Sequence, residues 1–171
     1  MCEADLRQAD LSQASLQQAD LTRAILIGAN LAEADLTKAN LTAASLMQAN
    51  LTAARLIVAD LTAANLRTAN LQEASLRRAR LDRADLRRAD LRRADLVGAS
   101  LEGADLGGAD LRDAKVTPEQ LGQAASLEGA TLPDGTKPSL APEPALSYAH
   151  VWPTREGALQ SVDRQETLIA T

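Results

Sequence analysis

The sequence has few of the residues on which catalytic and metal sites usually depend. Its 171 residues include one histidine, one cysteine, one tryptophan, one tyrosine and no phenylalanine. A single His and a single Cys, both outside the central part of the chain, are too few for a zinc site. Glycine motifs of the nucleophile-elbow, P-loop and dinucleotide-binding types are also absent. The sequence therefore argues against an enzyme and predicts neither a metal nor a cofactor.

Long apolar runs are missing too. Although 46% of the residues are hydrophobic, no 18-residue apolar stretch occurs, so we expect a soluble chain with no membrane span. The first residues lack the basic and apolar regions of a secretory signal, and the expected location is the cytoplasm. The lone Cys2 excludes an internal disulfide, which suits a reducing compartment.

What the sequence does contain is a strict five-residue period. Leucine occupies every fifth position from Leu6 to Leu111, twenty-two times without a substitution. Alanine occupies every fifth position from Ala4 to Ala114, and Val116 then replaces the next leucine. A fixed period of this kind is the mark of a repeat architecture.

Neither a helix nor a flat strand accommodates this period. A five-residue step turns about 140° around a helix and places successive leucines on alternate faces of a strand, so neither gives a buried stripe. The residue between alanine and leucine is Asp, Asn or Ser in nineteen of twenty-two units, with Ile25, Arg55 and Arg80 as exceptions. Such side chains bond to nearby backbone and favour turns. The pattern predicts stacked coils with Ala and Leu inside.

The residues alone leave the number of sides per coil open. Thr22, Thr42 and Thr62 suggest a 20-residue coil with four sides. Thr22, Thr37 and Thr52 fit a 15-residue coil with three sides equally well.

The tandem A-[DN]-L-x-x motif resembles the pentapeptide-repeat family, in twenty-three consecutive units from Ala4 through Val116. This resemblance implies an all-β solenoid, a right-handed quadrilateral β-helix with four units per coil and leucine as the central inward residue. Many relatives carry phenylalanine there, which this chain lacks. Some relatives resemble B-DNA in shape and charge and bind type II topoisomerases such as gyrase.

Three regions follow from the pattern. Residues 1–116 form the repeat β-helix, and residues 117–134 form a C-terminal cap. In the cap, Thr117 and Pro118 begin a short helix near 117–124, and two units one residue out of phase follow it. Residues 135–171 form a Pro-rich linker and tail. Tyr148 and Trp152 in this tail are candidates for docking to a partner or to the shaft, and a mobile tail is the alternative.

Two sets of outward residues are candidate contact surfaces. The first is an apolar contact strip. The second is an arginine-rich belt, for which a solvated ladder of ion pairs, with Arg93 between Glu73 and Asp113, is the favoured interpretation and a binding patch the alternative. The apolar strip comprises Ile27, Met47, Ile57 and Val58, and the basic belt comprises Arg67, Arg77, Arg78, Arg87, Arg88, Arg92, Arg93 and Arg112.

The favoured function is a non-catalytic scaffold that binds an unknown protein partner. A DNA mimic directed at a type II topoisomerase and an anion or nucleic-acid binder acting through the belt are the alternatives. Residues 4–118 carry no net charge, whereas mimicry of DNA needs about −3 per coil, and the shaft has no aromatic side chains for base stacking. We also expect end-to-end homodimers through the edge of the first coil.

Overall fold

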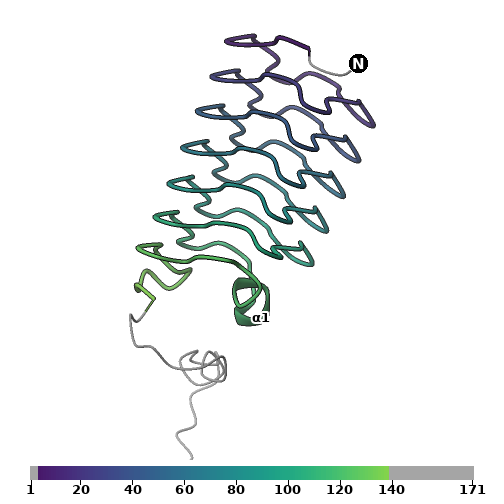
Figure 1. Cartoon of the computed structure of the whole chain (residues 1–171). Helices are drawn as coiled ribbons and strands as arrows, with labels where there is room; N and C mark the ends of the chain where they lie inside the picture. The colour runs from purple at the N-terminus through teal and green to yellow at the C-terminus, as the bar shows by residue number, and fades with distance from the viewer. Residues whose placement is uncertain (1–3, 139–171) are drawn as a thin grey trace, which may run out of the picture.

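The computed structural model describes residues 4–138, which form a shaft of stacked coils with helix α1 (Pro118–Leu121) at its C-terminal end (Figure 1). Parallel bridges join positions 20 residues apart, from Asp5 with Ile25 to Asp95 with Lys115. Four five-residue units therefore make one coil, and the three-sided alternative is excluded.

Every unit contains a ladder residue, between its alanine and its leucine, and two turn residues after the leucine. In a representative unit, the backbone N–H of Asn50 donates to the carbonyl of Ala29 in the preceding coil at 2.9 Å. The N–H of Leu51 donates to the carbonyl of Asn70 in the following coil at 2.7 Å. A turn follows immediately after each ladder residue and its leucine. The pairing within residues 4–138 therefore consists of isolated bridges, and none of them is extended into a longer strand.

The turn is closed by a bond from the alanine N–H of one unit to the leucine carbonyl of the unit before it. For Ala54 and Leu51 the distance is 3.0 Å. The second turn residue, here Ala53, has a φ of 56° and donates its N–H to the next coil. The chain thus changes direction at a residue in the left-handed region of backbone space.

These bonds leave the N–H of the first turn residue in each unit without a backbone acceptor. An Asp or Asn side chain at the ladder position supplies that acceptor. The Oδ1 atom of Asn50 accepts from the N–H of Thr52 at 3.2 Å, and Asp20 does the same for Thr22 at 3.1 Å. This bond recurs at the Asp and Asn ladder positions along the shaft and confirms the prediction for these two residue types. Among the serines at ladder positions within residues 4–138, Ser126 alone makes it, with the N–H of Glu128 at 3.2 Å. Ile25 has no side-chain acceptor with which to make it.

The interior is filled by the two invariant columns. Leucines from Leu26 to Leu111 and alanines from Ala24 to Ala109 are buried. This placement confirms that both side chains point inward. In the first described coil, Leu6, Leu11 and Leu16 are only half-buried. End-to-end pairing through this coil stays a prediction.

Helix α1 begins with the predicted signal. Thr117 accepts from the N–H of Gln120 at 3.3 Å, and the Gln120 side chain accepts from the N–H of Thr117 at 3.0 Å. The helix is shorter than the segment near 117–124 that the sequence predicts. After it the bridges join positions 21 apart, Asp105 with Ser126 and Asp110 with Thr131. The predicted one-residue change of phase is therefore present, and the helical segment takes up the extra residue.

No helix among residues 4–138 is both long enough and apolar enough to cross a bilayer.

Candidate interaction surfaces

The four-sided coil sorts the outward residues into four faces. A face is defined here as one column of ladder residues together with the two turn residues after each of them. The first face begins at ladder position 5, the second at 10, the third at 15 and the fourth at 20, and each continues every 20 residues. The first and third faces lie on opposite sides of the coil.

The four residues of the predicted apolar strip do not form one strip. Ile27 and Met47 occupy the same turn position on the first face, one coil apart, and both are half-buried. Ile57 and Val58 follow the ladder residue Arg55 on the third face, on the other side of the shaft. The grouping was wrong because positions 47 and 57 are two units apart, which is half a turn of a four-unit coil.

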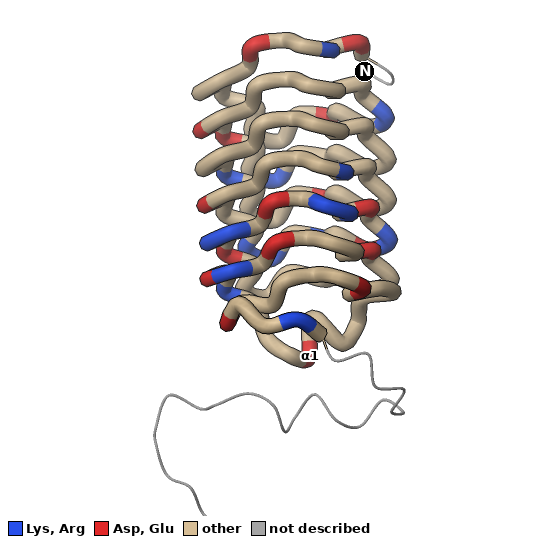
Figure 2. The backbone as a smooth tube through the Cα atoms, turned by 90° about the vertical axis from the view of Figure 1, so that its left-hand side faces the viewer, with Lys and Arg blue, Asp and Glu red and all other residues tan. Residues whose placement is uncertain are grey.

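The arginine belt runs around the shaft and is not confined to one face. Its members lie on three faces in the C-terminal half of the shaft, where the basic positions are densest (Figure 2). The first face holds Arg67, Arg87 and Arg88, the second holds Arg92, Arg93 and Arg112, and the third holds Arg77 and Arg78.

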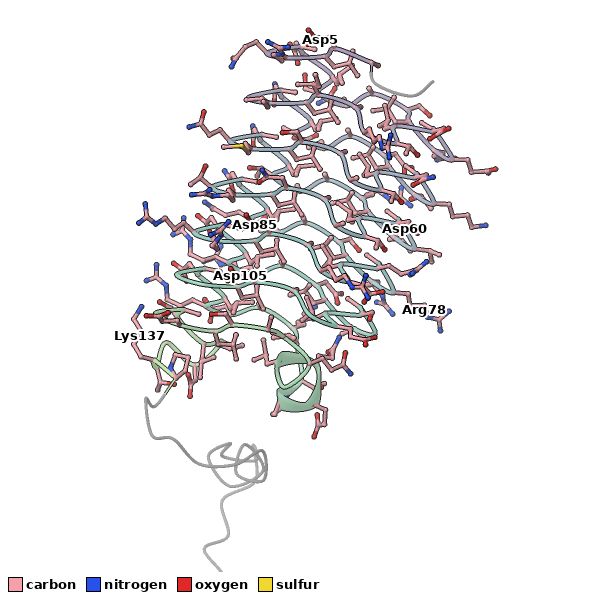
Figure 3. The ribbon with its side chains drawn as sticks, viewed as in Figure 1. Asp5, Asp60, Arg78, Asp85, Asp105 and Lys137 are labelled. Atoms are coloured by element: carbon pink, nitrogen blue, oxygen red, sulfur yellow. The ribbon has the colours of Figure 1, made fainter. Side chains whose placement is uncertain are left out.

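Most belt arginines are paired with carboxylates. Arg87 contacts Asp85 on its own ladder position at 2.5 Å and Asp105 in the next coil at 3.5 Å. Arg92 repeats the arrangement with Asp90 at 2.7 Å and Asp110 at 3.9 Å. Figure 3 shows Asp85 and Asp105 on the same side of the shaft, one coil apart. The two columns are ladders of alternating charge.

These contacts shift the ionisation of both partners. Hydrogen bonds from the Arg87 guanidinium lower the pKa of Asp85, and the same bonds raise the pKa of Arg87. The Arg112 guanidinium, 2.6 Å from Asp110, lowers the pKa of that carboxyl. The carboxylates therefore remain charged at neutral pH and balance the arginines beside them.

Arg93 has one of the two partners expected from the sequence. Its guanidinium lies 3.3 Å from Glu73, one coil toward the N-terminus. Among the described residues no ion pair joins Arg93 to Asp113, although both line a shallow groove of about 250 Å³ on the second face. Arg92 and Arg112 also line this groove, and both are held by aspartates.

The faces differ in net charge over residues 4–118. The first face has four basic and three acidic side chains, and the second has three basic and six acidic ones. The third face has five basic and two acidic side chains, and the fourth has three basic and four acidic ones. The net charges are thus +1, −3, +3 and −1. The absence of net charge on the shaft as a whole conceals a basic third face beside an acidic second face.

Tyr148 and Trp152 are outside the described residues. Within residues 4–138, no group of three or more His, Cys, Asp or Glu side chains could hold a metal ion.

One structural feature of the surface was not predicted. Eighteen non-glycine residues in the described part of the chain have positive φ, and in the repeats they all occupy the second turn position. Val58 and Thr68 are the β-branched members of this set, with φ of 58° and 55°. The available signal was glycine, since Gly28 and Gly98 occupy the same turn position as Val58.

Comparison with known proteins identifies the family. The model of pentapeptide repeats matches residues 4–42, 44–83 and 79–117, with eight copies. These matches cover more than half of the chain, which therefore belongs to the pentapeptide-repeat family. No curated protein matches the sequence.

The chain is similar to solved structures of pentapeptide repeat proteins. HetL, a pentapeptide repeat protein involved in heterocyst differentiation regulation from the cyanobacterium Nostoc sp. strain PCC 7120, is 40% identical, with a TM-score of 0.46. The match covers 79% of this chain and 66% of HetL, so the chain spans slightly less than two thirds of that protein's length.

QnrB1, a plasmid-mediated fluoroquinolone resistance protein, is 22% identical over 76% of this chain and 77% of its own, with a TM-score of 0.59. It is similar in fold. Rfr23, a pentapeptide repeat protein from the cyanobacterium Cyanothece 51142, is 26% identical over 75% and 80% of the two chains, with a TM-score of 0.42.

Proposed function

We propose that this protein is a non-catalytic scaffold that presents the faces of a rigid solenoid to other proteins. The observation that carries the proposal is the separation of structural and outward residues within each unit. Alanine, leucine and the ladder side chain fill the core and hold the turn, while the main chain of the two turn residues completes the backbone bonds between coils. These backbone bonds do not depend on which side chains the turn residues carry, so those side chains can vary and make contacts.

The turn residues use this freedom. At the first turn position of the first face the chain carries Arg7, Ile27, Met47 and Arg67 in successive coils. Cationic and apolar side chains thus replace one another at one structural site, and the backbone bonds around them are retained. A surface of this kind suits recognition by contact more than chemistry at a cavity.

The proposal is tested by capture of a host protein on the immobilised full-length chain. Four variants, each with the turn residues of one face replaced by Gln or Thr, keep the core and serve as one another's controls. We expect one protein, identified by mass spectrometry, to bind saturably and to be lost from one variant only. Equal capture by all four variants, or none by the natural chain, would contradict a scaffold role.

The DNA-mimic alternative is weaker on this geometry. Duplex DNA carries one charge per about 1.7 Å, or about −3 for each coil of about 4.8 Å. The most acidic face reaches −3 over the whole of residues 4–118. Recovery of gyrase in the capture experiment would restore this alternative.

The anion-binding alternative is also weaker, because aspartates and Glu73 pair with most of the belt. The belt arginines without an ion pair within residues 4–138 are Arg67, Arg78 and Arg88. Arg78 lies on the opposite face from the other two, and the face that holds Arg67 and Arg88 has a net charge of only +1. These charges do not converge on one ligand.

We further infer that helix α1 caps the shaft. The Gln120 amide donates to the carbonyls of Leu96 and Ala99 at 2.8 and 2.7 Å, and Leu121 is buried against the core. The bond to Ala99 supplies a donor to a carbonyl of the last coil that would otherwise lack one, while the Leu96 carbonyl also accepts from the N–H of Ala99 at 2.9 Å.

A further inference from the structure

The third face is the place where exposed apolar side chains and unbalanced positive charge coincide. Among the described residues, two large hydrophobic side chains are strongly exposed, Val58 at 46% and Val97 at 47%. Both lie on this face. The backbone N–H of Val58 donates to the carbonyl of Arg77 at 2.9 Å, and that of Arg78 donates to the carbonyl of Val97 at 3.0 Å, so these residues belong to three adjacent coils.

The charge on this face is not neutralised internally. Its two acidic side chains, Asp35 and Asp95, are occupied by Arg55 at 3.6 Å and Arg77 at 3.8 Å. The three remaining cations have no ion pair within residues 4–138 and are all exposed. They are Lys38, Arg78 and Lys115. Figure 3 shows Arg78 extending outward from the shaft on the side away from Asp85 and Asp105.

Val58 is held at a backbone cost that its side chain does not offset. Its φ of 58° lies in the left-handed region, which costs an L-residue about 1–2 kcal/mol and is least suited to a β-branched side chain. Thr68, at the same turn position on the first face, donates its hydroxyl to the carbonyl of Arg67 at 2.6 Å. Valine has no such bond, and its side chain is largely exposed. Strain without an internal gain is a feature of binding sites.

We propose that the third face binds an extended acidic segment of a partner protein, with apolar side chains of that segment against Val58 and Val97. This inference rests on the scaffold function and names the face and the chemistry of the partner. Carboxylates of the segment would face Lys38, Arg78 and Lys115. Lys38 and Lys115 are four coils apart, or about 19 Å, which an extended chain spans with about six residues. The net charge of +3 favours such a ligand over a neutral one.

The test uses the full-length chain and a fluorescein-labelled peptide of about ten residues, with two leucines among Asp and Glu. Binding is followed by fluorescence anisotropy at low and at high salt. A peptide with Lys in place of the acidic residues and one with Ser in place of the leucines are the ligand controls. We expect the acidic leucine peptide to bind, the other two to bind at least about tenfold more weakly, and added salt to weaken binding without abolishing it.

The variants use residues that this face already carries at equivalent positions. Val58→Gln and Arg78→Gln copy Gln18, and Val97→Gln copies Gln17, so the triple variant should fold normally. The matched control on the opposite face is Met47→Gln with Arg88→Gln. We expect the third-face variant to bind the acidic peptide at least about tenfold more weakly and the control to change less than about twofold. Equal losses in both would overturn the proposal in favour of general charge attraction.

Two further outcomes separate this inference from its alternatives. If a host protein is captured and only the first-face variant loses it, the third-face assignment is wrong while the scaffold function stands. If neutralising the acidic residues of 139–171 in the full-length chain tightens peptide binding about tenfold, this chain's own C-terminal segment occupies the face, and the external partner is excluded. The residues to change are Glu143, Glu156, Asp163 and Glu166.

Discussion

The alanine column offers the sharpest test of how the shaft is packed. Ala69 is 1% exposed, and the alanines one coil away on either side, Ala49 and Ala89, are also buried. The N–H groups of Asn70 and Asp90 bond across these coils at 2.9 Å, so the coils cannot separate to admit a larger side chain. Ala69→Leu adds three carbons to a filled interior. We expect a loss of about 3 kcal/mol in unfolding free energy, the upper end for overpacking.

Two variants calibrate this loss. Leu66→Met, in the same turn, conserves volume and should cost less than about 1.5 kcal/mol. Ala9→Leu places the same side chain in the same column of the first coil, where the alanine is half-buried, and should cost less than Ala69→Leu. Urea unfolding followed by circular dichroism should separate Ala69→Leu from Leu66→Met by about 1 M in midpoint. If Leu66→Met proves the more damaging, or if Ala9→Leu equals Ala69→Leu, the inward alanine column is refuted.

The same urea assay checks three further predictions, and acid unfolding a fourth. Asn50→Ala removes the acceptor of the Thr52 N–H at 3.2 Å and should cost about 1–2 kcal/mol, whereas Arg55→Ala should cost less than about 1. Gln120→Met leaves the Ala99 carbonyl without a donor and removes one of the two donors to the Leu96 carbonyl, and it should cost about 1–3 kcal/mol, with faster hydrogen exchange near the helix. Val58→Gly removes the side chain that disfavours the left-handed backbone and should raise the unfolding free energy by up to about 1 kcal/mol. The gain is small because glycine also increases the conformational entropy of the unfolded chain. The Thr37 hydroxyl and the Gln17 amide lower the pKa of Asp35 to about 2, below its ordinary 3.8. The stabilisation of the fold by the Asp35 carboxylate is therefore complete above about pH 4 and is lost as the pH falls through about 2. The Asp35→Asn variant should show a flatter acid-unfolding curve in this range.

The core of this fold was predictable from the sequence because one physical requirement is repeated in every unit. Leucine and alanine recur without exception where the interior admits only those volumes, so the period by itself places both columns inside the coil. The ladder residues were predictable for a similar reason, because Asp, Asn and Ser are the side chains that can accept from the next turn. The start of helix α1 followed from local capping chemistry at Thr117.

The number of sides and the grouping of surface residues were harder to predict. Nothing in a five-residue unit records how many units close a coil, since each unit is satisfied by any coil above and below it. The apolar strip grouped Ile27, Met47 and Ile57 because all are apolar and outward, and a 20-residue coil keeps Ile27 and Met47 on one face but places Ile57 on the opposite face. The left-handed turn position was obscured because most of its occupants, such as Gln48 and Arg83, carry no preference for that conformation.

Insertions and deletions affect the five-residue unit and the 20-residue coil in different ways. Removing one pentapeptide leaves every leucine and alanine in register, so the interior survives. All residues after the deletion, however, are rotated by a quarter turn around the shaft. If the deletion precedes Arg78, that residue is then stacked on residues that belonged to a different face. Only insertions or deletions of whole coils preserve both the interior and the pattern that a partner reads.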